Sequence, residues 1–140
     1  MRFMKKRKQD GFTLLEIMLV VTIIALLMAA AIYKMAPAVD VAKKTRIQAD
    51  IGAIRTMLLS YQGMNGFYPS TEQGLRAFVE RPESDPVPNR WTRLMDSVPT
   101  DPWGKDYVYR CPGTKNPSGY DIYSSGPDRI PDTQDDDWGQ

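Results

Sequence analysis

The stretch FTLLEIMLVVTIIALLMAAAIY, residues 12–33, decides how this chain is organised, because its 22 residues are almost all apolar. As a helix they would extend about 33 Å, enough to cross a hydrocarbon core of roughly 30 Å. Glu16 is the one charged residue in the stretch. A carboxylate at the centre of a bilayer costs on the order of 3 kcal/mol or more, so we expect a functional role for Glu16. The alternative is a carboxylate hydrated near the headgroups.

The segment before this stretch is strongly basic. Five cations fall within the first eight residues, whereas the chain after Gly11 carries 13 Lys and Arg against 16 Asp and Glu. The positive-inside rule places such a basic head in the cytoplasm and the remainder of the chain outside, although Lys34 and several later cations blur the signal. A basic head on an acidic body argues against a nucleic-acid-binding domain, which would have a basic face.

The composition excludes several kinds of chemistry. The chain has one cysteine, Cys111, and no histidine. No intramolecular disulfide is therefore possible, and neither a Ser-His-Asp arrangement nor a typical zinc site can form. The sequence also lacks a glycine-rich phosphate-binding loop. We expect that the protein is not an enzyme.

The apolar stretch permits two kinds of processing. A secretory signal has an apolar region of ~7–15 residues and small residues at the cleavage site, and Ala29 to Ala31 fit such a site. Cleavage there would release a soluble protein. The observed stretch is longer than that range, which favours a segment that is retained after export.

Residues 5–16, KKRKQDGFTLLE, resemble the type IV prepilin signature: a basic leader, a glycine, and Phe-Thr-Leu-x-Glu at the start of an apolar helix. The resemblance implies a leader over residues 1–11, cleavage after Gly11 by a prepilin peptidase, and N-methylation of Phe12. Residues 12–33 would be retained as membrane anchor and filament core. The resemblance further implies that Glu16 pairs with the N-terminal amine of a neighbouring subunit during assembly. Such a pair in an apolar core would set the register between subunits.

Helical periodicity continues beyond the apolar stretch. One face of a helix would carry apolar residues at spacings of three and four: Ile47, Ile51, Ile54, Leu58 and Tyr61. This pattern predicts a long helix from about Phe12 to Gln62. Pro37 predicts a kink within it; prepilins usually have their proline at the position of Tyr33. Ser70 and Gln73 have the spacing of a capping box, which predicts a short helix over Thr71–Glu80.

Two later segments are rich in β-forming residues, 107–111 and 120–124. Turn residues lie between them, so we expect an antiparallel pair with one more short strand, packed on the long helix. The predicted fold class is α+β: a long N-terminal α-helical spine, packed on a small globular domain with a short antiparallel β-sheet.

The C-terminal segment is acidic, with five carboxylates at Asp128, Asp132, Asp135, Asp136 and Asp137. The simplest interpretation is a solvated tail. Gly126-Pro127 and Pro131 instead favour a constrained loop, and Trp138 offers an apolar anchor. A constrained loop of carboxylates and carbonyls suits a hard cation, and Ca²⁺ tolerates irregular geometry better than Mg²⁺. The spacing is not that of an EF-hand.

Three segments closely resemble the major pseudopilins of type II secretion systems: FYPSTEQGL at 67–75, DPWGKDYVY at 101–109 and SSGPDRIPDTQDD at 124–136. The resemblance implies a calcium loop with Asp128, Asp135 and Asp136 as carboxylate ligands. It also implies backbone carbonyl ligands from Ser125 and Ile130. Arg129 and Asp137 depart from the family pattern, which often has Gly and an aliphatic residue there.

The resemblance implies a periplasmic domain over residues 34–140, anchored in the inner membrane by a single span. Copies of the chain would polymerise into a periplasmic pseudopilus that drives folded proteins across the outer membrane. Its partners would be minor pseudopilins and an inner-membrane assembly platform. Two alternatives stay open: a subunit of a type IV or DNA-uptake pilus, and a secreted soluble calcium-binding module.

Overall fold

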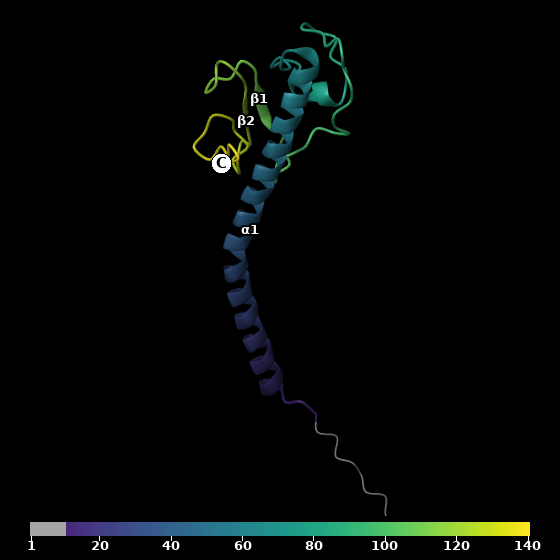
Figure 1. The fold of residues 1–140 in the computed structure, drawn as a ribbon. Coiled ribbons are helices and arrows are strands. Elements are labelled where there is room, and N and C mark those ends of the chain that lie inside the picture. The colour runs from purple at the N-terminus through teal and green to yellow at the C-terminus, as the bar shows by residue number, and fades with distance from the viewer. Residues whose placement is uncertain (1–10) are drawn as a thin grey trace, which may run out of the picture. The chain divides into compact units, whose positions relative to one another are not determined.

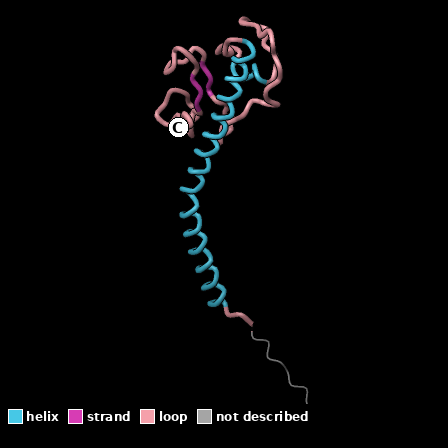
Figure 2. The backbone as a smooth tube through the Cα atoms, in the orientation of Figure 1, coloured by secondary structure: helices cyan, strands magenta, loops and turns pink. Residues whose placement is uncertain are grey.

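The computed structural model describes residues 11–140, so the predicted leader lies outside the described residues except for Gly11. The elements follow the chain as α1 (Leu14–Asn65), the 3₁₀ helix η1 (Gly74–Phe78), β1 (Val108–Arg110) and β2 (Asp121–Tyr123). The chain divides into two compact units, one ending at Val39 and the other spanning Asp40–Gln140. Figure 1 and Figure 2 trace these elements along the chain.

The long helix predicted over residues 12–62 is α1, with both ends shifted by two or three residues. Pro37 lies inside the helix, and the helical assignment continues through it. An interior proline removes one backbone donor and tends to kink a helix, but α1 continues on both sides of Pro37. The kink itself stays a prediction. At the other end, the Gly66 N–H donates to the Gln62 carbonyl at 2.7 Å, and Gly66 has a φ of +85°, which ends the helix.

The core of the unit Asp40–Gln140 forms on the predicted apolar face of α1. All five residues of that face are fully buried: Ile47, Ile51, Ile54, Leu58 and Tyr61. They pack with Phe78 of η1 and with Tyr107, Tyr109 and Ile122 from the region of the sheet. In Figure 1 both strands lie beside the C-terminal part of α1. The α+β fold and the packing of the sheet on the helix are confirmed.

The predicted capping box is present, but the helix after it is shorter than predicted. The Ser70 N–H donates to Oε1 of Gln73 at 3.1 Å, and the Gln73 N–H donates to the Ser70 hydroxyl oxygen at 3.3 Å. The short helix predicted over Thr71–Glu80 is present only as the 3₁₀ helix η1, after a turn over residues 71–73. Gly74 has a φ of +56°, which no α-helical residue adopts.

The sheet has two strands, not three. β1 and β2 are antiparallel, with Val108 opposite Tyr123 and Arg110 opposite Asp121. Within residues 11–140, the remaining pairings are isolated bridges, Thr100 with Asp106 and Ser124 with Asp137. The additional short strand predicted beside this pair is therefore wrong for the described residues, where further pairing is limited to these single bridges.

Candidate functional site

The junction predicted for cleavage lies just ahead of α1. Gly11 and Phe12 are outside the helix, and the Phe12 side chain is 78% exposed. The Glu16 N–H donates to the Thr13 side-chain oxygen at 3.3 Å and to the Thr13 carbonyl at 3.1 Å. The Glu16 carboxylate therefore sits in the first turn of α1, where the helix dipole favours a negative charge.

Among the described residues, the large apolar side chains of α1 ahead of Asp40 are exposed. Their exposed fractions run from 46% to 85% between Leu14 and Val39. By length and composition, α1 is a helix that could cross a membrane. A continuous apolar surface of this extent requires lipid or other protein around it. It could therefore serve as anchor, as filament core, or as both in turn.

A second candidate site begins where β2 ends. The backbone N–H and carbonyl of Ser124 pair with those of Asp137 at 2.9 and 3.0 Å, which closes the acidic loop between them. The Ser124 hydroxyl donates to Oδ2 of Asp101 at 2.7 Å, and both side chains are buried. Oδ1 of Asp101 accepts from the N–H groups of Trp103 and Lys105 at 3.0 and 2.8 Å. One buried carboxylate thus holds both the Asp-Pro-Trp-Gly turn and the base of the acidic loop.

Two of the predicted ligands lie together in this loop. Oδ2 of Asp135 accepts a hydrogen bond from the Asp128 N–H at 3.2 Å. Oδ1 of Asp135 accepts one from the Thr133 hydroxyl at 2.6 Å, and this bond lowers the pKa of the Asp135 carboxyl. Oδ1 of Asp128 accepts from the Ile130 N–H at 2.8 Å, and the Ile130 carbonyl lies 3.1 Å from the same Thr133 hydroxyl, whose one proton it shares with Asp135. The oxygens of Asp128, Asp135 and Ile130 therefore face one internal hydrogen-bond network.

Asp136, the third predicted carboxylate ligand, has one oxygen without a donor. Its Oδ2 accepts from the Asp132 N–H at 2.9 Å, whereas its Oδ1 is buried and has no hydrogen-bond partner among the described residues. Burial raises the pKa of this carboxyl. The buried Ser125 hydroxyl likewise has no partner in that part of the chain. Buried oxygens without donors are uncommon in proteins, and they suit a cation or an ordered water.

The loop fits a hard cation by its chemistry more than by its spacing. Its carboxylate and carbonyl oxygens are the ligands that Ca²⁺ prefers, and Oδ1 of Asp136 accepts no hydrogen bond from any residue over 11–140. Within residues 11–140, however, no three Asp, Glu, Cys or His side chains lie in an arrangement that could hold a metal ion. The structure thus brings Asp128 and Asp135 together but does not bring all three carboxylates to one point.

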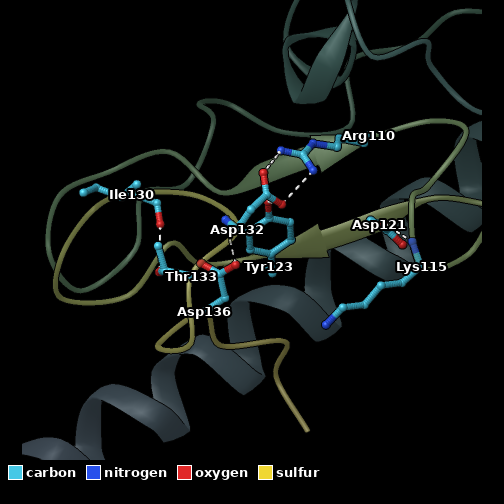
Figure 3. A network of polar contacts seen from close by, with 8 residues as sticks. All are labelled: Arg110, Lys115, Asp121, Tyr123, Ile130, Asp132, Thr133 and Asp136. Carbon is cyan, nitrogen blue, oxygen red and sulfur yellow. Dashed lines mark hydrogen bonds and ion pairs between the residues drawn. The ribbon is translucent and has the colours of Figure 1, made fainter.

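Asp132 has a partner that the sequence did not indicate. Arg110 forms a two-pronged ion pair with it, with N–O distances of 2.9 and 2.7 Å. The Tyr123 hydroxyl also donates to Asp132, at 3.0 Å (Figure 3). The guanidinium lowers the pKa of Asp132 and the carboxylate raises that of Arg110. No local signal links Arg110 to Asp132, whereas the Asp101 turn has the recognisable composition of an Asx-turn.

Two family models together match most of the chain. The model described as "Type II secretion system (T2SS), protein G" matches residues 34–138. The model described as "Prokaryotic N-terminal methylation motif" matches residues 6–32.

Full-length relatives and a solved structure give the same result. The chain is 44% identical over 127 residues to type II secretion system core protein G of Pseudomonas aeruginosa, which is 89% of this chain and 88% of that protein. It is 39% identical over 136 residues to the core protein G of Escherichia coli K12, covering 94% and 92%. It is also similar to the crystal structure of the major pseudopilin from the type 2 secretion system of enterohaemorrhagic Escherichia coli. The TM-score is 0.66 at 38% identity, over 73% of this chain and 90% of that one.

Proposed function

The chain belongs to the protein G family of type II secretion systems, and from this membership we propose that it is the major structural subunit of a pseudopilus. Copies would polymerise in the periplasm, and growth of the filament would drive folded proteins across the outer membrane. The family is one of structural secretion subunits rather than enzymes. The observation that carries the proposal is the order of the two family matches, a methylation motif followed directly by a protein G domain.

The proposal assigns three functional parts to the chain. Residues 1–11 form the leader, residues 12–33 the membrane and filament-core segment, and residues 34–140 the periplasmic domain. A prepilin peptidase would cut between Gly11 and Phe12 and methylate the new amine of Phe12. The exposed position of this bond ahead of α1 supports access by a peptidase. Before assembly, the chain would be a single-pass inner-membrane protein with its C-terminal domain in the periplasm.

Assembly would transfer the exposed apolar side chains of α1 from lipid to neighbouring subunits. Glu16 would then accept the amine of Phe12 from an adjacent copy. An isolated charge in an apolar bundle is costly, whereas a pair offsets that cost and fixes one register. Minor pseudopilins and an inner-membrane assembly platform would be the other protein partners. Nothing in the charge distribution favours nucleic acid as a partner.

We also propose that the acidic loop binds a structural Ca²⁺. Asp128, Asp135 and Asp136 would supply carboxylate oxygens, and Ser125 and Ile130 would supply carbonyls. The donor-free oxygen of Asp136 and the placement of Asp128 beside Asp135 support this ligand set. When bound, the ion would neutralise carboxylates that otherwise repel one another, and so hold the C-terminal segment on the domain.

Mass measurement of the mature N-terminus tests the main proposal. Filaments sheared from cells that overproduce the protein should contain chains that begin with N-methylated Phe12. A mature chain that begins near Ala29 to Ala31 would instead identify a secreted soluble protein and overturn the filament proposal. Deletion of the gene for this chain separates the pilus alternative, because loss of protein secretion identifies a pseudopilin whereas loss of adhesion or DNA uptake identifies a pilus subunit.

A further inference from the structure

The Arg110–Asp132 pair joins the acidic loop to the sheet. Arg110 is the last residue of β1, and Asp132 lies in the middle of the loop. The guanidinium contacts both oxygens of the carboxylate, and the Tyr123 hydroxyl of β2 donates to Oδ1 (Figure 3). All three contacts come from strand residues, so the loop is fastened to the sheet at Asp132.

This pair is exposed, with side-chain exposures of 30% for Arg110 and 62% for Asp132. Exposed ion pairs contribute little to stability, so its main consequence is geometric. A forked contact to a carboxylate specifies direction as well as distance, which a single ammonium does not do. The pair therefore fixes where Asp132 lies and which way its backbone faces.

The backbone of Asp132 passes this constraint to Asp136. Asp132 has a φ of +67°, a left-handed conformation uncommon for residues other than glycine. In that conformation its N–H donates to Oδ2 of Asp136 at 2.9 Å. The other oxygen of Asp136 is then the buried one that has no donor among the described residues. Arg110, Asp132 and Asp136 form one continuous series of contacts.

We propose that Arg110 is a positioning residue for the acidic loop. Arg110 holds the Asp132 carboxylate away from a bound cation and, through the backbone of Asp132, turns Oδ1 of Asp136 toward that cation. The inference rests on the calcium loop proposed above and does not depend on filament assembly. It divides the acidic residues by role: Asp132 is neutralised by a resident guanidinium, and Asp128, Asp135 and Asp136 stay available to an ion.

Simple electrostatics predicts the opposite effect of removing Arg110. Loss of a positive charge beside a cation site should tighten cation binding, whereas loss of the Asp132 charge should weaken it. If Arg110 acts by positioning, both losses weaken binding. The two explanations therefore predict opposite changes in calcium affinity when Arg110 is removed. The expected size is about 10–100-fold, which is typical for the loss of an outer partner of a metal ligand.

The test is isothermal titration calorimetry, in which CaCl₂ is added to the full chain in detergent micelles and the calcium affinity is measured. We expect Arg110→Gln and Asp132→Asn each to weaken calcium binding by about 10–100-fold. Arg129→Gln is the control, because it removes the same charge from within the acidic loop itself, and Arg129 has no side-chain ion pair in the described part of the chain. It should leave binding unchanged or slightly tighter. The reversed pair, Arg110→Asp with Asp132→Arg, should recover part of the lost affinity.

Arg110→Lys keeps the positive charge but cannot make the two-pronged contact with Asp132. This variant separates loss of positioning from general misfolding. It should melt like the wild type in chelator and still bind calcium more weakly. Calcium binding by Arg110→Gln as tight as the wild type or tighter overturns the proposal. A wild-type chain that takes up no calcium overturns it together with the cation site, whereas failure of the filament proposal would be seen separately, in the sheared fraction.

Discussion

The Ser124 hydroxyl donates a 2.7 Å hydrogen bond to the Asp101 carboxylate inside the domain, where both side chains are buried. The same hydroxyl oxygen accepts from the Gly126 N–H at 3.2 Å. Asp101 also accepts two N–H groups of its own turn. One carboxylate therefore connects two segments far apart in the sequence, and the acidic loop starts from a position that Asp101 determines.

Replacement of Asp101 should destabilise the domain more than any surface carboxylate does. Asp101→Ala leaves three buried or half-buried donors without an acceptor, at about 1–3 kcal/mol for each that stays unsatisfied. We expect a loss of at least ~3 kcal/mol, and each kcal/mol lowers Tm by about 4–8 °C in a domain of this size. Thermal unfolding followed by circular dichroism measures the loss. Asp106→Ala, an exposed acid of the same segment, is the control, and equal Tm values for the two variants would contradict the assignment.

Glu16→Leu should abolish filament assembly without preventing membrane insertion. Leucine lowers the cost of insertion, but the amine of the neighbouring subunit loses its counter-charge, and a broken buried pair costs about 3–5 kcal/mol. Immunoblots of membrane and sheared fractions measure the two steps. Thr22→Val is the matched control, because Thr22 is a polar residue of the same segment whose hydroxyl donates only to its own helix, at Met18. Sheared filaments of Glu16→Leu at wild-type levels would remove the proposed role.

Chelation of calcium should lower the Tm of the full chain in micelles. An ion that binds only the folded loop stabilises it by about 2.7 kcal/mol at 100-fold saturation. Asp128→Ala should abolish this response, because it removes a proposed ligand. Asp137→Asn should retain it, because the Asp137 carboxylate accepts from the Gly139 N–H and is not among the proposed ligands. A Tm of the wild type that is insensitive to chelator would exclude a structural calcium.

Gly126→Ala should disrupt the acidic loop. Gly126 has a φ of +67°, and an added Cβ would meet the Asp135 carbonyl oxygen and lie 2.7 Å from its Oδ2. Gly66→Ala is a matched control, since Gly66 has a φ of +85° and nothing within 4 Å of an added Cβ. Both variants bear the cost of a left-handed alanine, about 1–2 kcal/mol, but only Gly126→Ala adds a clash. Denaturant unfolding should therefore show a clearly larger loss for Gly126→Ala; equal losses would mean that the loop yields at no cost.

The domain should lose stability as the pH rises above about 10. Burial raises the pKa of five tyrosines above the ordinary value of 10.0: Tyr61, Tyr107, Tyr109, Tyr120 and Tyr123, the last to about 12. The folded chain keeps these protons while the unfolded chain releases them, so stability is full below pH 10 and falls above it. Tm values across that range, together with tyrosinate absorbance, measure the effect. Tyr107→Phe should make the decline shallower, and an unchanged slope would refute the coupling.

Local patterns in the sequence determined most of the architecture. The long helix, its buried face, its glycine stop, the capping box at Ser70 and the two strands all follow from residues within a few positions of one another. Such features depend on backbone propensity and on periodic burial, both of which are readable from a short window. Family membership was likewise evident from short motifs, because they combine polar and small residues at fixed places.

Only the tertiary structure decided how the acidic loop is held. Arg110 and Asp132 are 22 residues apart, and Asp101 and Ser124 are 23 apart. No periodicity joins such residues, since they meet only when the chain turns back on the sheet and buries its aromatic face. The same return of the chain holds Asp132 on the sheet and leaves Oδ1 of Asp136 without a hydrogen-bond donor among residues 11–140. Sequence therefore determined which groups are present, and packing determined which of them are already paired.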